Sequence, residues 1–359
     1  MDTLLTDIFK AYYDARRNKR NTPSQLRFEM NLETNLINLY HELRDRKYKP
    51  SPSVCFIVQD SVKREVYASD FRDRVVHHLY YNYVSHLFDK QFIYDSYSCR
   101  KGKGTLLGIE RLQHHIRSAS RNYTRKSYIL KMDIQGYYMS INREKLCAMV
   151  HEMTERVELP QQTKQFIDYL TDVITLKDPM NGAKFKGNPN EWNDLPPSKC
   201  LSYSPAGVGL PIGDLTSQLY SNIFLNKLDR FITIALGFKH YGRYVDEFYI
   251  VDNDFKHLKN KITKVSKFLE ALCLKLHPKK TKILPVTEPI RFLGAVVYPY
   301  YRHCSSRTMH KFLNRRRSYI NLIENKNDSV NFDVNKCMSS MTSYIGYLHH
   351  FKCERKILF

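Results

Sequence analysis

The chain lacks several features that mark well-known classes of protein. None of its apolar runs approaches the roughly 20 residues needed to span a bilayer, so we expect no membrane partner. Residues 1–20 lack the apolar stretch and small-residue site of a secretory signal, and this predicts a cytoplasmic protein. Internal repeats and low-complexity linkers are also missing, so the lobes of the 359-residue chain should pack against one another.

Cysteine is present but lacks the spacing that gives it a structural role. The eight cysteines lie far apart, and none forms the close pairs typical of zinc sites or disulfide frameworks. We expect reduced thiols, mostly buried, and their spacing predicts no structural zinc site.

Acidic residues are scarce relative to basic ones. The chain has 36 Asp and Glu against 57 Lys and Arg, which gives a formal net charge of +21. Such a field attracts polyanions and is screened by salt, so nucleic acid is the expected partner. The 42% of hydrophobic residues is ample for a folded interior, and the length predicts two or three connected lobes.

Hydrophobic spacing predicts helices and one hairpin in the first third of the chain. Residues 3–45 are predicted to form two helices joined by a basic linker, and residues 73–88 another helix. Residues 50–66 are β-rich and predict a hairpin whose return arm carries Lys63 and Arg64. Thr105 is predicted to cap the helix that follows a glycine-punctuated segment.

The remainder of the chain alternates strand and helix patterns. An apolar strand ends at Asp133, and a long helical region is predicted over residues 143–175. Residues 178–209, rich in Gly, Pro and Asn, are interpreted as an inserted loop, followed by an amphipathic helix from residue 215. Two β-type runs around Asp246 and Glu247 predict a hairpin with carboxylates at its tip, and the basic tail from residue 305 is predicted to be helical.

Three carboxylates therefore occupy the ends of predicted strands. Phosphoryl transfer depends on divalent cations at the attacking oxygen and the triphosphate, and such cations prefer carboxylate oxygens. Taken singly, Asp133 fits a turn or helix cap, and the pair Asp246 and Glu247 fits a solvated turn. Tyr138, five positions after Asp133, and Arg243, just before the acidic pair, make the combination more specific.

These segments resemble the ordered motifs of reverse transcriptases, and more narrowly those of prokaryotic diversity-generating retroelements. The resemblance covers roughly residue 21 to the C-terminus. Its motifs are DFRDRVVHHLYYNYV (70–84), SYSCRKGKGT (96–105), LKMDIQGYYMSI (130–141), GLPIGDLTSQLYSNIFLNKLD (209–229), YVDE (244–247), LHPKKTKI (276–283) and RFLGAVV (291–297).

The resemblance implies an α+β fold of the right-hand polymerase type. Fingers with a β-hairpin would span residues 1–125, a palm with an antiparallel sheet residues 126–300, and a small helical thumb residues 301–359. Fingers and palm interleave in this family, so these boundaries are approximate.

The resemblance also implies the catalytic groups. Asp133, Asp246 and Glu247 would hold two Mg²⁺ ions, for which Mn²⁺ is a substitute. Glu247 stands where the family normally has a second aspartate. Its extra methylene moves the carboxylate by about 1 Å or more, a displacement to which catalysis is sensitive. A working but metal-sensitive enzyme is therefore expected.

By the same resemblance, seven residues would form the nucleotide site. Tyr138 would lie under the sugar and exclude a 2′-hydroxyl, although a core tyrosine is the alternative. Ile212 replaces an amide that group II intron enzymes present to the incoming nucleotide, which implies relaxed fidelity. A solvated side chain is the alternative for Lys280. The full nucleotide set is Lys63, Arg64, Tyr138, Ile212, Gly213, Gln218 and Lys280.

Template and primer contacts are expected from basic surfaces and from the glycine turn of RFLGAVV. Basic clusters in residues 16–20 and 117–126 belong to this footprint, and each charge taken alone is equally explained as a solvated surface group. The residues assigned to primer and template are Arg100, Lys101, Phe292, Leu293, Gly294, Arg315, Arg316 and Arg317.

The resemblance implies an error-prone RNA-directed DNA polymerase of prokaryotic or phage origin. Its partners would be a template-repeat RNA, a cDNA or primer, deoxynucleoside triphosphates, and a small basic four-helix-bundle accessory protein that forms a pentamer. Two alternatives stay open, namely a defence-associated reverse transcriptase acting against phage and a catalytically weak RNA-binding scaffold of polymerase fold.

Overall fold

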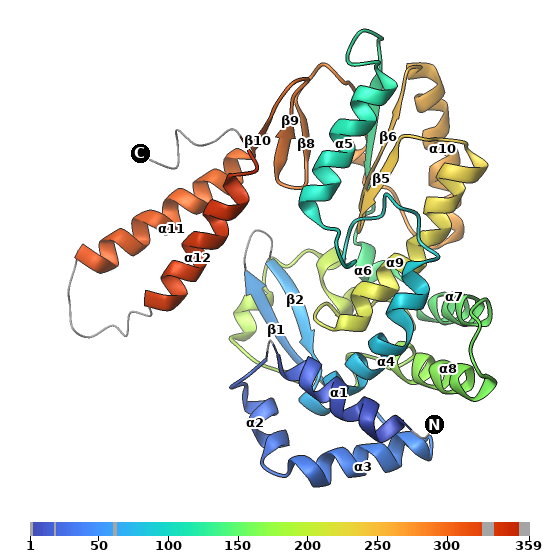
Figure 1. Cartoon of the computed structure of the whole chain (residues 1–359), viewed down its shortest axis with the longest axis vertical. Helices are drawn as coiled ribbons and strands as arrows, with labels where there is room; N and C mark the ends of the chain where they lie inside the picture. The colour runs from blue at the N-terminus through green and yellow to red at the C-terminus, as the bar shows by residue number, and fades with distance from the viewer. Residues whose placement is uncertain (1–2, 18, 60–62, 325–333, 352–359) are drawn as a thin grey trace.

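The computed structural model describes residues 3–17, 19–59, 63–324 and 334–351 of the chain. Within these residues the chain builds a helical base, an antiparallel four-stranded sheet covered by helices, and a projecting pair of C-terminal helices (Figure 1).

The helical base is formed by α1 (Leu4–Arg16), α2 (Pro23–Glu29), α3 (Leu32–Arg44) and α4 (Phe71–Asp89). The expectation of two helices before residue 45 was wrong, because a third helix, α2, begins in the last residues of the predicted linker, 15–24. That helix begins at Pro23, and the side chain of Thr22 accepts a hydrogen bond from the Gln25 amide. Proline in the first turn and threonine at the cap are typical helix-start residues.

The predicted hairpin is present as β1 (Val54–Gln59) and β2 (Lys63–Ala68), which pair antiparallel. A third strand, β4 (Lys184–Phe185), pairs parallel with β1. Residues 178–209 are therefore not the plain loop that was predicted. They contain β4 and the short 3₁₀ helices η1 (Pro189–Trp192), η2 (Pro197–Lys199) and η3 (Leu201–Tyr203).

A buried carboxylate attaches this segment to the hairpin. Glu65 on β2 is 1% exposed and accepts hydrogen bonds from Trp192 Nε1 (3.0 Å) and the Leu201 amide (2.8 Å). Buried charges need such partners, and the pattern of apolar and turn residues in the segment gave no sign of them.

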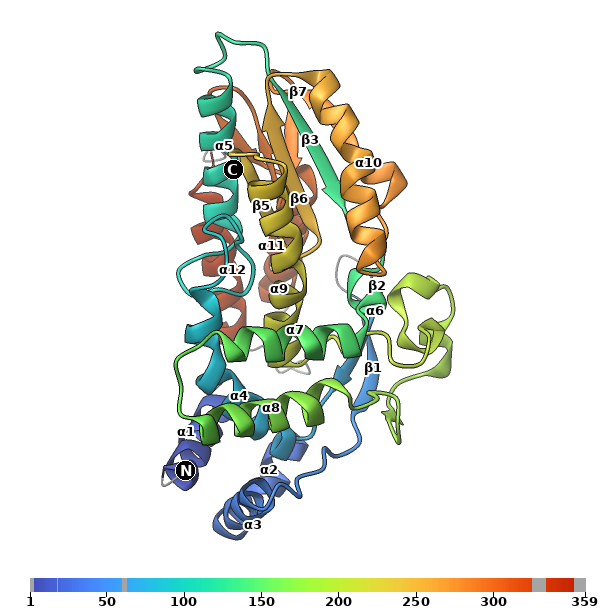
Figure 2. The ribbon, with the colours of Figure 1, turned by 90° about the vertical axis from the view of Figure 1, so that its right-hand side faces the viewer.

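The predicted long helix over residues 143–175 is two helices, α7 (Arg143–Glu155) and α8 (Gln161–Thr175). Pro160 occupies the N-cap of α8 and interrupts the helical period. The two helices lie side by side (Figure 2), with α7 against α9 (Leu215–Arg230) and α8 against α4.

Helix α9 is the centre of the larger hydrophobic core. Residues on all its sides are buried, so the predicted amphipathic character was wrong. Its polar side chains are buried by neighbouring helices, which the sequence alone cannot show. A short π-helical segment, Phe231–Ala235, follows directly.

The main sheet has the order β5 (Tyr241–Tyr244), β6 (Glu247–Asp252), β3 (Tyr128–Asp133), β7 (Lys282–Pro285), all antiparallel. Alternation along the strands separates two cores. Leu130 and Met132 belong to the core shared with α9 and α10 (Phe255–Ala271), and Ile129 belongs to the core shared with α5 (Thr105–Ala119).

Helix α5 starts at Thr105, but this residue does not cap it. The N-cap is Gly104, whose φ of 141° is suited to glycine, and no side chain bonds the first turn. The predicted helix start was right to the residue, and the predicted capping bond was wrong.

A small antiparallel sheet of β8 (Ile290–Phe292), β9 (Ala295–Val297) and β10 (Arg302–Cys304) joins the main body to the C-terminal helices. The sheet crosses residue 300, where the sequence placed a palm–thumb boundary. The predicted helical tail is present as α11 (Ser306–Glu324) and α12 (Val334–Leu348), which project to one side (Figure 1).

Disulfides and membrane-spanning helices can be looked for in the described part of the chain. No cysteine there is in a disulfide, and Cys353 lies outside it. None of the helices described is both long and apolar enough to span a membrane.

Candidate active site

The sheet brings the three predicted carboxylates to one end. Asp133, the last residue of β3, pairs in register with Glu247, the first residue of β6. Asp246 lies in the tight turn before β6, and its carbonyl accepts a hydrogen bond from the Ile134 amide (3.1 Å). The predicted strand end and hairpin tip are therefore neighbours.

Asp246 is in an environment that disfavours its charge. Burial raises the pKa of Asp246, and the negative charge of Asp133 raises it further, while Lys199 and Lys280 partly oppose the shift. Two carboxylates that repel one another in a partly buried position are what a divalent cation would stabilise. The pair Asp133 and Asp246 thus fits a hard divalent ion.

Lysines neutralise the two outer carboxylates in this structure. Lys280 Nζ lies 2.8 Å from Asp133 Oδ2, and Lys131 Nζ lies 2.9 Å from Glu247 Oε1. Lys131 also donates to the Arg291 carbonyl. In the described residues, the three carboxylates do not each place an oxygen within 4.8 Å of the others. The three carboxylates therefore do not all converge on one point in this structure.

The turn that carries Asp246 is strained. Val245 has a φ of 52°, a left-handed conformation that is costly for a β-branched residue. Its carbonyl accepts a hydrogen bond from Arg243 Nη1 at 3.1 Å. The buried arginine thereby holds the acidic turn in a conformation that the local sequence disfavours.

Arg243 belongs to a fully buried ion pair with Asp229 at the end of α9. Both side chains are 0% exposed, and Nε and Nη2 bond the two carboxylate oxygens at 2.7 and 2.6 Å. Tyr241 Oη donates to the same carboxylate at 2.6 Å. The role of Asp229 was not predicted from the sequence, because its pairing with Arg243 depends on how α9 packs against β5.

Tyr138 lies beside this turn on the short helix α6 (Tyr137–Ser140). It is half-buried and packs against the main core, and burial raises its pKa to about 12. The charge of Asp246 contributes to that shift. The structure thus brings Tyr138 close to a predicted catalytic carboxylate while also giving it core contacts.

Ile212 and Gly213 join the segment before α9 to the hairpin of the fingers. The Ile212 carbonyl accepts a hydrogen bond from the Tyr67 amide at 3.0 Å, and its side chain packs on a small core that includes Tyr67. A Cβ at Gly213 would lie 2.7 Å from the Tyr67 carbonyl oxygen, so only glycine fits there.

Lys63 and Arg64 are on β2, with Arg64 exposed and Lys63 Nζ bonded to the Asn193 carbonyl at 2.8 Å. The segment 178–209 that supplies Asn193 also approaches the residues after β3. A Cβ at Gly136 would lie 3.1 Å from Ser198. The predicted insertion therefore extends from the fingers hairpin to the residues that follow Asp133.

Gln218 is separated from the carboxylates. It lies exposed in the first turns of α9, in a depression lined also by Lys19, Arg74, His78 and Gly213, and none of the three carboxylates lines it. The structure does not bring Gln218 together with the other predicted nucleotide-binding residues near Asp246.

Arg100 was predicted to contact primer or template, and in this structure its side chain is bonded within the protein. Its side chain is 6% exposed, with Nε 2.5 Å from Asp89 Oδ1 and Nη1 donating to the carbonyls of Ile93 and Ser96. All of these bonds tie the loop 93–100 to the end of α4. Its neighbour Lys101 is exposed.

Phe292 was also assigned to the primer, but its ring is only 2% exposed. It packs edge-on against Tyr249 with the ring centroids 5.2 Å apart, so it is a core residue. Leu293 and Gly294 form the turn that follows, with φ of 49° and 80°. The Gly294 carbonyl accepts a hydrogen bond from the Ser305 amide at 2.7 Å. The turn itself stays at the surface between sheet and thumb.

The predicted basic group on the thumb lies on α11. Arg315 and Arg317 are exposed and Arg316 is partly buried. The guanidinium of Arg315 lies over the ring of Tyr319, 6.0 Å from its centroid.

Comparisons with known proteins agree with this geometry. The family profile described as reverse transcriptase (RNA-dependent DNA polymerase) matches residues 60–297. No curated protein matches the chain.

A telomerase structure shares the fold. Telomerase from Candida albicans in complex with a fragment of telomeric RNA superposes with a TM-score of 0.51 at 12% identity, over 90% of this chain and 58% of that one. Telomerase from Candida tropicalis, without RNA, gives 0.48 at 12% identity over 70% of this chain and 48% of that one. The chain thus spans 58% of the Candida albicans telomerase chain.

The family match covers more than half of the chain and includes Asp133, Asp246 and Glu247. The chain belongs to the reverse transcriptase family and has its α+β right-hand polymerase fold.

Proposed function

We propose that the chain is an RNA-directed DNA polymerase whose active centre is the carboxylate end of β3 and β6. The observation that carries the proposal is the placement of Asp133 beside the turn of Asp246, with the charge of one raising the pKa of the other. A strained turn holds two repelling carboxylates close together. This arrangement costs free energy of folding and favours the binding of divalent ions.

Asp133 and Asp246 would hold two Mg²⁺ or Mn²⁺ ions, with Glu247 as the third carboxylate. When bound, the ions activate the attacking 3′ oxygen and offset the charge of the triphosphate. Lys280 balances Asp133 in this structure. We propose that it would also contact the phosphates of an incoming nucleotide.

The chain's own residues would position the nucleotide. Lys63 and Arg64 would donate charge-assisted hydrogen bonds to the triphosphate. Tyr138, a neutral phenol at physiological pH, would lie under the sugar and exclude a 2′-hydroxyl. The exposed arginines of α11 and the turn Leu293–Gly294 would contact the primer and template duplex.

The biological task we propose is error-prone copying of a template-repeat RNA in a diversity-generating retroelement. The form of the fourth motif supports it, with Ile212-Gly213 and Ser217-Gln218 similar to diversity-generating enzymes. Ile212 cannot make the amide contact that checks base-pair geometry. The partners would be that RNA, the growing cDNA, deoxynucleoside triphosphates and a pentameric basic four-helix-bundle accessory protein. All would act in the cytoplasm of a prokaryotic or phage-infected cell.

Primer extension on RNA tests the polymerase directly. The wild type should extend a DNA primer with deoxynucleotides in Mg²⁺, Asp133→Ala should not, and Asp252→Ala, at the far end of β6, serves as the matched control. A wild type that is inactive in Mg²⁺ and in Mn²⁺, with the co-encoded RNA supplied, would favour the RNA-binding scaffold.

Sequencing the cDNA made from the co-encoded RNA tests the biological task. Misincorporation concentrated opposite template adenines, together with a template and variable repeat pair at the locus, is the expected result. Untemplated or repetitive DNA from a locus without such repeats would favour the defence role.

A further inference from the structure

A cluster of metal-ligating side chains lies away from the polymerase carboxylates, between α7 and α8. Cys147 and His151 are one turn apart on α7, and Asp168 and Asp172 are one turn apart on α8. Residues four apart on a helix share a face, so two facing helices can turn these four side chains toward one another. The missing close cysteine pairs gave no hint of this site.

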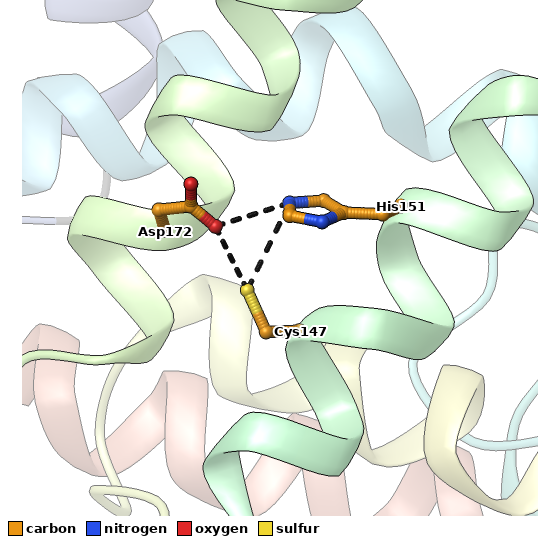
Figure 3. Close-up of side chains that lie close together, drawn as sticks. All are labelled: Cys147, His151 and Asp172. Carbon is orange, nitrogen blue, oxygen red and sulfur yellow. Dashed lines mark hydrogen bonds and ion pairs between the residues drawn. The ribbon is translucent and has the colours of Figure 1, made fainter.

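Three of the ligand atoms already converge (Figure 3). Asp172 Oδ1 lies 3.0 Å from Cys147 Sγ and 3.0 Å from His151 Nε2, and the sulfur lies 3.8 Å from that nitrogen. A tetrahedral zinc ion with its usual bond lengths would separate such atoms by about 3.3 to 3.6 Å. The observed triangle therefore needs shifts of only a few tenths of an ångström.

Asp168 supplies a fourth ligand. Its Oδ1 atom is buried without a hydrogen-bond partner, and it lies 3.9 Å from His151 Nε2, too far for a hydrogen bond. Mutual hydrogen bonding among the other three residues explains their own contacts but leaves this buried oxygen unsatisfied. Such orphaned acceptors are uncommon in folded proteins, and a bound cation would satisfy it.

We propose that these four residues form a structural zinc site that fastens α7 to α8. A mixed set of thiolate, imidazole and carboxylate suits Zn²⁺ and does not suit Mg²⁺, which prefers oxygen ligands alone. Cys147 is buried, whereas the side chains of His151 and Asp172 are 37% and 48% exposed. An ion therefore has a route from solvent.

The position of the site gives zinc a mechanical role. α7 packs against α9, α8 packs against α4, and Thr171 on α8 is hydrogen-bonded to Tyr80 on α4 at 3.0 Å. A cation joining α7 and α8 would link the central helix of the palm to the helical base of the fingers. Zinc should therefore raise the thermal unfolding temperature of the whole chain.

Titration of the full chain after treatment with a chelator tests the site. The wild type should bind one equivalent of Zn²⁺, and Co²⁺ in its place should give a thiolate-to-metal charge-transfer band. Cys147→Ser should abolish the band and weaken zinc binding by more than the roughly 10- to 100-fold typical of outer-shell changes. Cys273→Ser removes an exposed cysteine and should change neither.

Two further variants keep the test decisive. Asp168→Asn preserves size and should weaken zinc binding while the fold, followed by circular dichroism, stays intact. Asp246→Asn should leave the charge-transfer band unchanged, which separates this site from zinc bound at the polymerase carboxylates. Absence of stoichiometric binding in the wild type, or an unchanged cobalt band in Cys147→Ser, would overturn the proposal.

Discussion

Two pairs of charged groups each have one member on the hairpin β5–β6, Arg243 in one pair and Asp246 in the other, and the fold treats them in opposite ways. Asp229 is completely buried, yet Arg243 and Tyr241 satisfy both of its oxygens. Asp246 is only partly buried, yet it faces a second carboxylate, and its pKa is raised. We call the first pair balanced. We call the second unbalanced, because Lys280 is bonded to Asp133 while the pKa of Asp246 stays raised, and a divalent cation would offset the remaining charge.

The two pairs differ in their effect on folding. The pair Asp229 and Arg243 stabilises the fold, whereas the rest of the fold must offset the cost of the pair Asp133 and Asp246. A buried, bidentate ion pair is well tolerated as long as both partners remain. A left-handed valine costs of the order of 1–3 kcal/mol for folding. The repulsion between the two carboxylates adds to that cost. Arg243 connects the two regions, because it bonds Asp229 and also holds the Val245 carbonyl.

The largest expected effect is on activity at the unbalanced pair. Asp246→Asn should lower primer extension by at least about 1000-fold, because a charge that stabilises the transition state is lost. Its thermal unfolding temperature without divalent ions should equal or exceed that of the wild type, because the repulsion with Asp133 is removed. Steady-state extension and thermal denaturation of the same preparations measure both.

Asp252→Asn is the matched control for this variant. Asp252 ends the same strand and pairs with His257 at 2.6 Å near the surface. It should retain activity within a few fold. If Asp246→Asn unfolded at a clearly lower temperature than the wild type, the view of Asp246 as a strained, unbalanced group would be wrong.

The balanced pair should respond in the opposite way. Asp229→Asn leaves the charge of Arg243 buried without a partner, and breaking a buried pair costs about 3–5 kcal/mol of unfolding free energy. Urea denaturation followed by circular dichroism measures the loss, and Asp252→Asn, at a partly exposed pair, should cost less than about 1 kcal/mol. A change below that value for Asp229→Asn would show that the network does not support the turn.

The sequence predicted the unbalanced pair and missed the balanced one for a physical reason. Carboxylates at the ends of apolar strands are visible as local patterns, and the register that joins Asp133 to Glu247 follows from alternation. The pair of Asp229 with Arg243 depends on how a helix packs against a hairpin, and no local pattern encodes that.

The burial of two predicted primer and template residues has the same origin. Arg100 and Phe292 lie inside motifs that predict nucleic-acid contact, yet both side chains are used inside the fold. The strand β4, which completes the fingers sheet from a segment 130 residues further along, was equally invisible to hydrophobic periodicity. Helix and strand positions were predictable, whereas side-chain burial required the tertiary contacts.

A smaller effect is expected on the dependence of activity on pH. Because the pKa of Asp246 is raised, activity should begin to fall at a higher pH than for an ordinary aspartate, by up to about tenfold per pH unit. Stability of the ion-free protein should change in the opposite direction. The folded state binds this proton more tightly, so stability is gained as pH falls through the raised pKa.

Measuring both curves sharpens the comparison. In Asp246→Asn, the dependence of stability on pH should lose the contribution of this carboxyl group. Mg²⁺ should move the activity–pH curve of the wild type toward lower pH. Parallel changes of activity and stability with pH would show that general unfolding, not titration of the turn, governs the loss.

The smallest expected effect is at Glu247, which belongs to neither pair in this structure because its carboxylate bonds Lys131. Glu247→Asp shortens the side chain by one methylene and should weaken that ion pair, which is partly exposed and worth about 1 kcal/mol or less. The shorter carboxylate also moves toward the position usual in the family, so the rate should change by a few fold and the preference between Mg²⁺ and Mn²⁺ should shift.

Extension rates of the wild type, Glu247→Asp and Lys131→Met in each metal separate the two causes. If only the ion pair matters, both variants change alike and the metal preference stays constant. If carboxylate position matters, Glu247→Asp alone alters the preference.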